Sequence, residues 1–498
     1  MTLHCKNYIN GKWVDSSSKK TINRHNPADT SKVVSVVPAS IAKDVDDAVH
    51  AARIAYPQWK YVPAPKRAEL LYKVAQLLEL EKQTIAHFMC TEMGKALAEC
   101  LGDVQEGVDI GYYFAGEGRR LHGQTMPSEL RNKHIRTVRE PVGVFALITP
   151  WNFPVAIPCW KLFPALVAGN TVVLKPSNYV SGCATLLVQL FEKAGIPAGV
   201  VNLVHGSGDA VGNALVMHPD VDGVSFTGST NVGRNIGEYC GKHLMKHSLE
   251  MGGKNVVIVM DDADIDLAVD ACIWGAFGTT GQRCTATSRI VVHQRVYDSF
   301  KQKFAARARK LKLGNGIDKG VEVGPVLNED QLMKVLGYLS DAKKSKLNIL
   351  CGGKRAISGH LKNGYFIEPT VIDNPPRTHP VCCEEIFGPV VVVLKAKHFD
   401  DAISIANSVD YGLSAAIFTS NINHAHRAAE LLEVGIVYVN SATIGAEVQL
   451  PFGGIKNTGN GHREAGGSGG ALDTYTEIKV INVDFSGSLQ KAQGIDWK

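Results

Sequence analysis

Apolar residues recur at helical spacing between residues 41 and 118, for example at Leu71, Val74 and Leu78. This period predicts several amphipathic helices, each with one face packed on a core. Four short apolar runs come next, and each is followed by Gly, Pro or Ser and then by renewed helical periodicity. These runs are residues 143–148, 171–174, 200–204 and 221–226. Strands that alternate with helices in this way predict a parallel, doubly wound sheet.

A second series of the same kind begins at residues 256–259. A helical pattern follows, with Val269 and Ala276 on one face, and then an apolar run at residues 290–292. Two such series predict two α/β domains. The length of 498 residues agrees, because it exceeds what one ordinary core organises.

Two further segments have the pattern of extended chain. Residues 8–14 carry Asn10-Gly11 between apolar and aromatic residues, which predicts a tight hairpin. Apolar and polar residues alternate at 135–138, as in a half-exposed strand that needs a partner. The chain from residue 475 to its end is again extended, so it could pair with that strand, in the same subunit or in a neighbouring one.

Composition and charge exclude several classes of protein. The chain is 45% hydrophobic and 20% charged, which is typical of a globular protein rather than a disordered or fibrous one. Its net charge of +5 comes from scattered residues and not from a basic stripe, so we expect no nucleic-acid partner. The 11 cysteines form no CxxC pair and have no zinc-binding spacing with histidine, so we expect no metal and a reducing compartment. With no signal-like start and no apolar run long enough to cross a bilayer, we expect a cytoplasmic protein without a membrane partner.

Three polar residues stand out as candidates for chemistry. Cys284 follows an arginine in a glycine-rich turn, where a cation and free amides would lower a thiol pKa; the alternative is one more buried core cysteine. Glu250 precedes two glycines, where a semi-buried carboxyl with a raised pKa could be a general base; the alternative is a solvated loop acid. Asn152 lies among prolines and aromatic residues and could be a rigid oxyanion donor or part of a structural turn.

Candidate phosphate and ribose sites follow the other strands. Lys175 ends the second apolar run, at the strand end where open α/β sheets bind ligands. Gly228 and Ser229 open a helix after the fourth run, where free amides could hold a pyrophosphate. Neither these glycines nor those around Gly208 have the GxGxxG spacing. Each loop alone is a weak signal, but together they lie at one sheet edge and fit a dinucleotide.

Seven motifs occur in one order across residues 149–459, and through them the sequence resembles the aldehyde dehydrogenase superfamily. The motifs are TPWNFP, LVAGNTVVLKPS, FTGSTNVG, LEMGGKN, GQRCT, EEIFGPV and PFGGIKNTG. The resemblance implies an α/β fold with two doubly wound parallel-sheet domains and a small β oligomerisation arm. It places an NAD(P)-binding domain at 1–121 and 142–253, a catalytic domain at 254–468, and the arm at 122–141 and 469–498. A homodimer or homotetramer is expected.

The resemblance also assigns roles to single residues. Cys284 matches the nucleophile that forms a thiohemiacetal and then a thioester, Glu250 the general base, and Asn152 the oxyanion donor. The expected cofactor is NADP or NAD. The residues expected at the cofactor are Ile148, Thr149, Trp151, Lys175, Ser177, Asn178, Gly208, Phe226, Gly228, Ser229, Glu250, Gly252, Glu385 and Phe387.

The substrate side is less defined by the motifs. Phe153, Trp160 and Phe452 match positions that line the aldehyde tunnel, with residues 443–450 at its mouth, although aromatic core residues are an equal alternative. Arg283 would either tune the thiolate or bind a substrate carboxylate. Within the family, the sequence looks most like the 2-oxoglutarate semialdehyde dehydrogenases, with the aminoadipate semialdehyde dehydrogenases as the neighbouring subgroup.

The sequence departs from the family pattern at two positions, and two other functions are compatible with the fold. NAD-preferring members often carry a glutamate where this chain has Asn178, and a neutral amide would not repel a 2′-phosphate, so we predict that NADP is used, alone or alongside NAD. His462 interrupts a Gly-Arg-Glu pattern and is assigned no role. A coenzyme A-acylating semialdehyde dehydrogenase is one rival, disfavoured by Glu250. A non-catalytic family member is the other, disfavoured because all three catalytic candidates are present.

Overall fold

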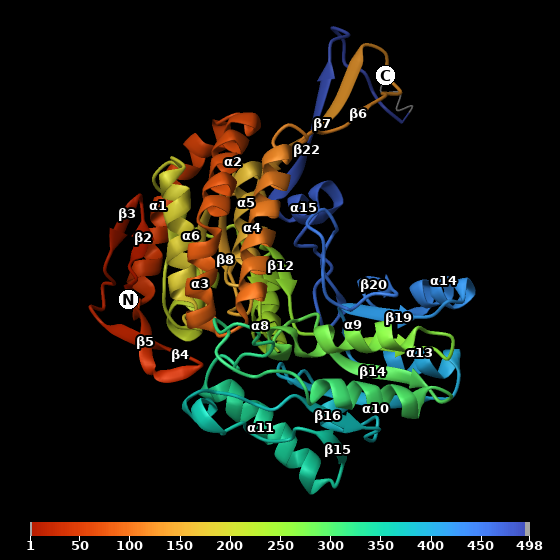
Figure 1. Ribbon diagram of the computed structural model, residues 1–498. Helices are drawn as coiled ribbons and strands as arrows, with labels where there is room; N and C mark the ends of the chain where they lie inside the picture. The colour runs from red at the N-terminus through yellow and green to blue at the C-terminus, as the bar shows by residue number, and fades with distance from the viewer. Residues whose placement is uncertain (1, 494–498) are drawn as a thin grey trace.

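The computed structural model describes residues 2–493 and contains two seven-stranded sheets and a projecting β arm (Figure 1). The first sheet has five parallel strands extended by an antiparallel hairpin. In sheet order its strands are β12 (Lys246–Glu250), β11 (Gly223–Thr227), β8 (Val144–Ile148), β9 (Thr171–Lys175), β10 (Val201–Leu203), β2 (Asn7–Ile9) and β3 (Lys12–Val14). The hairpin is the one predicted: Asn10 and Gly11 both have positive φ, of 51° and 75°, as a type I′ turn requires.

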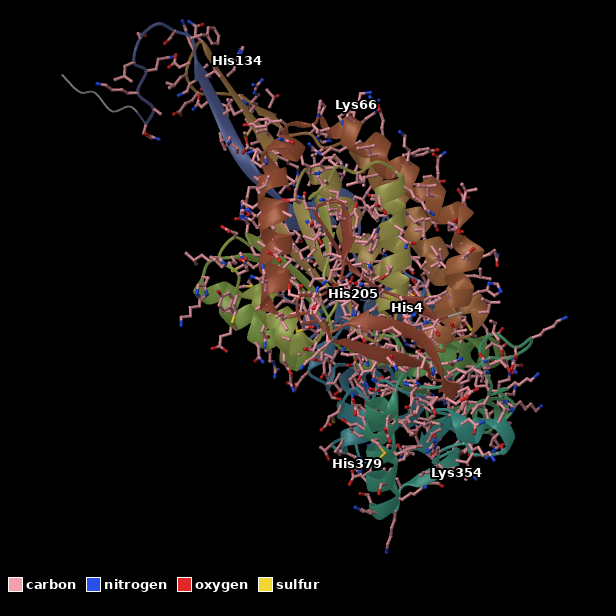
Figure 2. All side chains as sticks on the ribbon, turned by 90° about the vertical axis from the view of Figure 1, so that its left-hand side faces the viewer. His4, Lys66, His134, His205, Lys354 and His379 are labelled. Atoms are coloured by element: carbon pink, nitrogen blue, oxygen red, sulfur yellow. The ribbon has the colours of Figure 1, made fainter. Side chains whose placement is uncertain are left out.

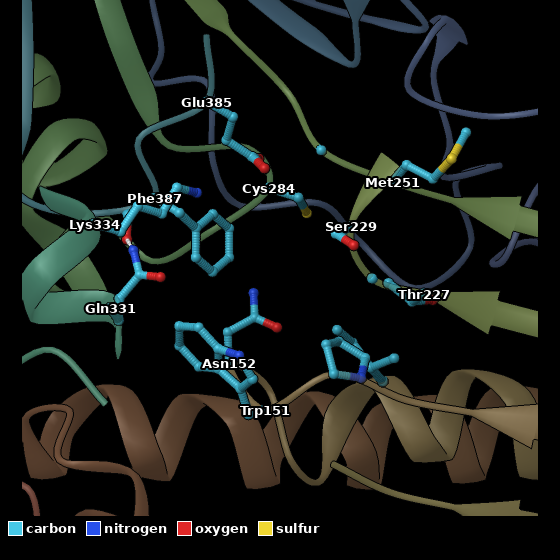
Figure 3. A pocket seen from close by; sticks show the side chains of 14 residues that line it. Trp151, Asn152, Thr227, Ser229, Met251, Cys284, Gln331, Lys334, Glu385 and Phe387 are labelled. Carbon is cyan, nitrogen blue, oxygen red and sulfur yellow. Dashed lines mark hydrogen bonds between the residues drawn. The ribbon is translucent and has the colours of Figure 1, made fainter. Parts of the chain in front are cut away.

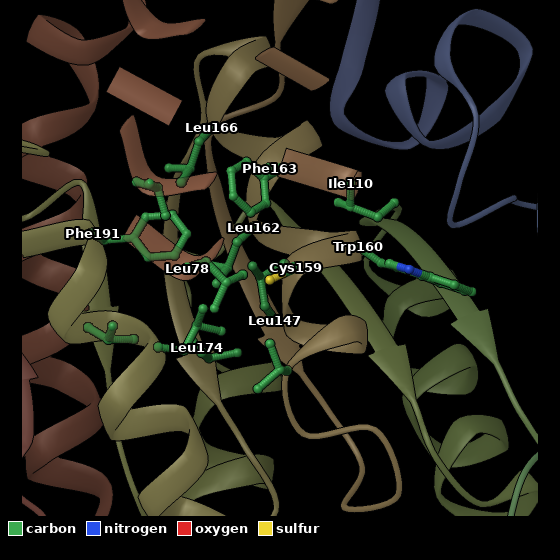
Figure 4. Packing of buried hydrophobic residues seen from close by; sticks show 14 of the residues in the cluster. Leu78, Ile110, Leu147, Cys159, Trp160, Leu162, Phe163, Leu166, Leu174 and Phe191 are labelled. Atoms are coloured by element: carbon green, nitrogen blue, oxygen red, sulfur yellow. The ribbon is translucent and has the colours of Figure 1, made fainter. Parts of the chain in front are cut away.

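Helices cover both faces of this sheet, which explains why its strands are apolar throughout rather than alternating. On β8, Phe145 and Leu147 pack into one core, while Val144 and Ala146 pack into the core on the opposite face. Figure 4 shows the first of these cores, where Leu147 of β8 lies against the helices. The helices are α1 (Ala42–Tyr61), α2 (Ala64–Leu80), α3 (Lys82–Met93), α4 (Leu97–Glu117), α5 (Ala156–Ala168), α6 (Ser181–Lys193), α7 (Asn213–Val216) and α8 (Thr230–Lys242).

The second sheet is parallel except for one edge strand. In sheet order its strands are β15 (Asn348–Cys351), β16 (Thr370–Asp373), β17 (Val390–Ala396), β14 (Thr287–His293), β13 (Asn255–Val259), β19 (Ser414–Phe418) and β20 (Ile436–Val439). Its helices are α9 (Ile265–Phe277) and α10 (Tyr297–Ala308) on one face, and α11 (Glu329–Lys344), α12 (Pro380–Cys383), α13 (Phe399–Asn407) and α14 (Ile422–Leu431) on the other. The prediction of two doubly wound α/β units is therefore confirmed.

The projecting arm is a three-stranded antiparallel sheet in the order β22-β7-β6. Strand β7 (Lys133–Pro141) pairs along its whole length with β22 (Thr476–Asp484), and β6 (Thr125–Met126) adds a short edge. The segment around residue 135 thus pairs with the C-terminal segment of the same chain. The arm extends away from the body, with His134 near its tip (Figure 2). Residues 494–498, which the sequence assigned to the arm, lie outside the described residues.

The remaining elements are short. They are β1 (Leu3–His4), β4 (Thr21–Asn26) and β5 (Asp29–Pro38), which form a third small sheet, together with the pair β18 (Tyr411–Gly412) and β21 (Ile455–Lys456), and α15 (Leu472–Tyr475). Among residues 2–493, no helix is both long and apolar enough to pass through a bilayer.

Candidate active site

Three adjoining cavities lie around the carboxyl ends of the first sheet's strands and the loop before β14, and Cys284 lines two of them. The largest, about 450 Å³, lies at the carboxyl ends of the first sheet's strands and is called the strand-end cavity. The central cavity, about 170 Å³, shares Trp151 and Ser229 with it. The tunnel, about 90 Å³, shares Cys284 and Met251 with the central cavity. The three are therefore neighbours in a row, and Cys284 lies where the central cavity and the tunnel adjoin.

Ten of the residues expected at the cofactor line the strand-end cavity: Ile148, Thr149, Trp151, Lys175, Ser177, Asn178, Gly208, Phe226, Gly228 and Ser229. Lys175 ends β9, and burial lowers the pKa of its ammonium to about 8. Its Nζ donates to the main-chain oxygen of Pro176 at 3.0 Å. The buried hydroxyl of Thr149 has no hydrogen-bond partner among the described residues. Buried polar groups are rarely left in this state, so the cavity fits a ligand that brings its own polar atoms.

The same cavity has a helix N-terminus on its wall. Ser229 is the N-cap residue of α8, and its side chain caps none of the helix amides. The first amides of a helix are free donors and carry the positive end of the helix dipole, so they bind anions such as phosphate. A lysine, an unsatisfied hydroxyl and a helix N-terminus together match the ribose and pyrophosphate of a dinucleotide.

The central cavity holds the expected cofactor residues Gly252, Glu385 and Phe387 together with Cys284 and Asn152 (Figure 3). Glu385 accepts a hydrogen bond from the Gly253 amide at 2.8 Å, and burial raises the pKa of its carboxyl. A Cβ on Gly252 would lie 2.4 Å from the Glu385 carboxylate, so only glycine permits this approach. Cys284 and the Asn152 amide point into the cavity from opposite sides.

The environment of Cys284 corrects one expectation. Burial, reinforced by the nearby carboxylates of Glu385 and Glu250, raises the pKa of the Cys284 thiol above its ordinary value. The neighbouring cation does not prevent this, because the Arg283 guanidinium is paired with Glu99 at 2.9 Å and also donates to Thr279 at 2.9 Å. The prediction that Arg283 and the turn amides lower this pKa is therefore wrong, and a resting Cys284 is a thiol that needs a base.

Glu250 lies in the tunnel wall at the end of β12 and is 2% exposed. Neither of its carboxylate oxygens has a hydrogen-bond partner among residues 2–493. Burial and then the adjacent carboxylate of Glu464 hold the pKa of Glu250 well above its usual range. Glu464 itself is paired with the buried Lys161 and accepts from Thr227 at 2.8 Å, which fixes its position. The raised pKa is as the sequence predicted, and the solvated-loop alternative is wrong because the side chain is buried.

The four residues expected at the substrate, Phe153, Trp160, Arg283 and Phe452, all line the tunnel. The Trp160 and Phe452 rings are packed edge to face with centroids 4.6 Å apart. Gly445 and Ala446, from the segment expected at the mouth, also line the tunnel. Among residues 2–493, no group of three or more His, Cys, Asp or Glu side chains is placed to hold a metal ion.

Several lining residues were not predicted. Glu106 of α4 lines the tunnel, and burial raises the pKa of its carboxyl to about 8. Gln331 and Lys334 of α11 line the central cavity. All three lie on amphipathic helices with many polar residues, and the sequence pattern does not show which of these polar residues line a cavity. Only the packing of the two sheets brings them to Cys284.

Comparison with known proteins agrees with this geometry. The profile of the aldehyde dehydrogenase family matches residues 13–481. The chain is 42% identical over 477 residues to the alpha-ketoglutaric semialdehyde dehydrogenase of Bacillus subtilis, covering 96% of this chain and 97% of that protein. It is 40% identical over 473 residues to the NADP(+) succinate-semialdehyde dehydrogenase of Escherichia coli, covering 95% and 96%.

A solved structure has the same fold. The NAD+ complex of betaine aldehyde dehydrogenase from Staphylococcus aureus superposes with a TM-score of 0.95 and 36% identity, covering 98% of this chain and 96% of that one. The matches span nearly the whole chain and include both sheets and the arm. The chain thus belongs to the aldehyde dehydrogenase family, and it is an enzyme that oxidises an aldehyde to the carboxylic acid with NAD or NADP.

Proposed function

We propose that Cys284 is the nucleophile of this reaction, that Glu250 is its general base and that the Asn152 amide stabilises the oxyanion. The observation that carries the proposal is the meeting of the tunnel and the central cavity at Cys284, with Glu250 on the wall of one and Asn152 on the wall of the other. Three segments that are distant in sequence supply these groups.

The reaction begins with a proton transfer. Glu250, whose raised pKa makes it a better match for a thiol than an ordinary carboxylate, takes the proton of Cys284. The thiolate adds to the aldehyde carbon, and the carbonyl π electrons move to oxygen. The Asn152 side-chain amide and the Cys284 main-chain amide donate to that oxygen, which stabilises the tetrahedral thiohemiacetal.

The residues lining the strand-end cavity, with Glu385 and Phe387 in the central cavity, would hold NAD or NADP. A nicotinamide cofactor held there would supply the hydride acceptor that oxidation of the thiohemiacetal to the thioester requires. Glu250 gives up the Cys284 proton to solvent and, ionised again, removes a proton from water; the resulting oxygen nucleophile attacks the thioester, and the carbon–sulfur bond breaks. Cys284 leaves as thiolate and the acid is released.

We propose a carboxylate-bearing semialdehyde such as 2-oxoglutarate semialdehyde as the substrate. The relatives in Bacillus subtilis and Haloferax volcanii are named for that aldehyde. In this chain Arg283 lines the tunnel and is 13% exposed in its side chain, with Nε and Nη2 engaged by Thr279 and Glu99. A guanidinium held in this way can still offer Nη1 to a substrate carboxylate.

An aldehyde panel tests both the activity and the substrate class. We expect kcat/KM for 2-oxoglutarate semialdehyde to exceed that for uncharged pentanal by about tenfold or more, because a site built to pair a charged group rejects the analogue without it. Equal values would end the semialdehyde assignment. Added coenzyme A should leave the product as free acid, whereas acyl-CoA would support the acylating rival.

We also infer three properties that extend beyond the site. The NAD(P)-binding domain comprises 1–121 and 142–253, the catalytic domain 254–468, and the arm 122–141 and 469–498. The second is that the enzyme works in the cytoplasm.

The third is that the arm supports a homodimer or homotetramer. Ile478 and Val480 of β22 are 63% and 60% exposed, and an exposed apolar edge favours a partner that covers it. Measuring the molecular mass by light scattering tests the oligomeric state, and a monomer at assay concentration would refute the proposal.

A further inference from the structure

A buried ion pair lies directly beneath the Asn152 loop and has no part in the mechanism above. The Lys95 ammonium, just before α4, and the Asp103 carboxylate, in α4, are 2.6 Å apart, and both side chains are 0% exposed. Removing two charges from water is costly, and apolar residues of similar size often serve stability as well or better. A contribution to stability alone therefore does not explain why the protein has this ion pair in place of apolar residues.

The pair holds the loop that carries Asn152 at its middle and at its C-terminal end. Lys95 Nζ donates to the main-chain oxygen of Asn152 at 3.1 Å and lies 4.2 Å from the centre of the Phe153 ring. Asp103 Oδ1 accepts from the main-chain amide of Ala156, the first residue of α5, at 2.7 Å. The direction of the Asn152 side chain depends on its main chain, so these contacts determine where its amide points.

One turn earlier on α4, a second carboxylate holds the loop that carries Cys284. Glu99 accepts from the Thr279 amide at 2.7 Å and from the Arg283 guanidinium at 2.9 Å. Residues i and i+4 share one face of a helix, so Glu99 and Asp103 fix the two loops to neighbouring points of one rigid element. Thr279 has a left-handed φ of 50°, and a strained loop of this kind persists only when its surroundings hold it.

We propose that Lys95 and Asp103 are positioning residues that aim the Asn152 amide at the oxyanion formed on the Cys284 adduct, with α4 as the common support. The inference rests on the proposed function, because it requires Asn152 to be the oxyanion donor. A shift of an ångström in a donor of this kind is enough to lose much of its effect on the transition state.

A charge-neutral double variant separates positioning from folding. Lys95→Met alone leaves Asp103 buried and unpaired, so it lowers Tm strongly. Lys95→Met with Asp103→Asn removes both charges, and Asn keeps an oxygen for the Ala156 amide, so Tm recovers. The Asn152 carbonyl still lacks its donor, and we expect kcat to stay about 10- to 100-fold below that of the unmodified enzyme, the loss typical of a misplaced oxyanion donor.

Two readouts show whether the loss acts through Asn152. Alkylation of Cys284 by iodoacetamide is a displacement at carbon that forms no oxyanion, so its rate should stay unchanged in the double variant. In an Asn152→Ala background, the same two substitutions should cost no further kcat, because the donor that they position is absent. Asp103→Asn alone, which keeps the Lys95 contact to Asn152, is the milder variant and should lose less kcat than the double.

The opposite results overturn the inference. If the double variant recovers Tm and kcat together, the ion pair serves only folding. If alkylation slows in parallel with kcat, or if the kcat losses multiply in the Asn152→Ala background, the pair does not act through the oxyanion donor. If neither charge-removing variant folds, Asp103→Glu with full kcat would overturn it as well, because the longer side chain displaces both contacts. Failure of the proposed function is distinct, since Asn152→Ala alone would then keep its kcat.

Discussion

The two large sheets contribute to the site from opposite ends of their strands. In the first sheet the candidate residues follow the strands: Trp151 comes after β8, Lys175 ends β9, and Ser229 comes after β11. In the second sheet they precede the strands: Cys284 lies before β14, and Glu385 lies before β17. The carboxyl edge of one sheet therefore faces the amino edge of the other across the cavities.

The difference follows from what each edge can offer. The carboxyl edge of a parallel sheet opens into helix N-termini, whose free amides and positive dipole suit a phosphorylated ligand. The amino edge of the second sheet receives irregular loops, and one of them holds Cys284 beside left-handed Thr279 and Thr280, with φ of 50° and 59°. The phosphate and ribose contacts proposed above thus lie mainly at the regular edge, whereas the proposed nucleophile comes from the strained loop. Substitutions at the two edges should therefore affect different steps.

The largest effect should come from the second sheet. Cys284→Ala should lower kcat by at least about 10³-fold, the order found when a covalent nucleophile is removed, while cofactor affinity stays unchanged because the carboxyl edge of the first sheet is intact. Steady-state kinetics and a fluorescence titration with NADPH measure the two quantities. Cys351→Ala is the matched control, since this thiol is also partly exposed but lies on the edge strand β15 and should be dispensable. Retained activity in Cys284→Ala would remove the nucleophile assignment.

Glu250→Gln should have the next largest effect, a loss of about 10²- to 10⁴-fold, as for a general base. The pKa of Glu250 is raised and the base must be ionised, so activity of the unmodified enzyme should rise with pH along an acid limb whose midpoint lies above the ordinary carboxylate range. The variant should lose that limb. A pre-steady-state burst of reduced cofactor in the variant would restrict Glu250 to the water step, and an unchanged pH profile would exclude it from both steps.

The same division explains what could be predicted from the sequence. Lys175 and Ser229 follow apolar runs, so the rule that ligands bind at carboxyl strand ends places them at one edge without knowledge of the family, whereas Trp151 was assigned to the cofactor through the motifs. Cys284 and Glu385 precede their strands, where no such rule applies. The arginine and the glycines beside Cys284 made it a candidate, but only the motifs that resemble the family favoured it over a core cysteine, and they alone identified Glu385. The direction of the Cys284 pKa shift was missed because it comes mainly from burial, which the residues next to the thiol in sequence do not reveal. The neighbouring Arg283 is paired with Glu99, 184 positions earlier.

The core strands were predicted within a few residues, because full burial on both faces leaves a continuous apolar run. The small sheet of β1, β4 and β5 was not predicted. Strand β4 alternates exposed and half-buried positions in the sequence TINRHN, which contains a single apolar residue, and two register shifts interrupt its pairing with β5. A strand of this kind is defined by its partner rather than by its own pattern.

A moderate effect should appear at the cofactor edge. Asn178→Glu places a carboxylate in the strand-end cavity and should lower kcat/KM for NADP relative to NAD by about tenfold or more, since a like charge beside the 2′-phosphate costs several kcal/mol. Asn178→Gln keeps a neutral amide and should leave the ratio unchanged. If the unmodified enzyme already uses NADP far less well than NAD, the interpretation of Asn178 is wrong.

The smallest effect should come from Glu106, which lines the tunnel and belongs to neither strand edge. Burial raises its pKa to about 8; Asp103 and Asp109 also act to raise it, and Arg283 and Lys95 act to lower it. Below that pH the carboxyl is neutral, and above it the group is an anion close to Arg283. The ionised Glu106 carboxylate repels a substrate carboxylate and competes with it for the Arg283 guanidinium. KM for a carboxylated aldehyde should therefore rise about two- to tenfold between pH 7 and pH 9, which is the size of a partly screened charge interaction.

KM for an uncharged aldehyde of equal length should stay constant over this pH range, and Glu106→Gln should make the pH profile of KM flat for both aldehydes. A rise that persists in Glu106→Gln would assign the effect to another group, and a rise shared by the uncharged aldehyde would separate it from Arg283 altogether.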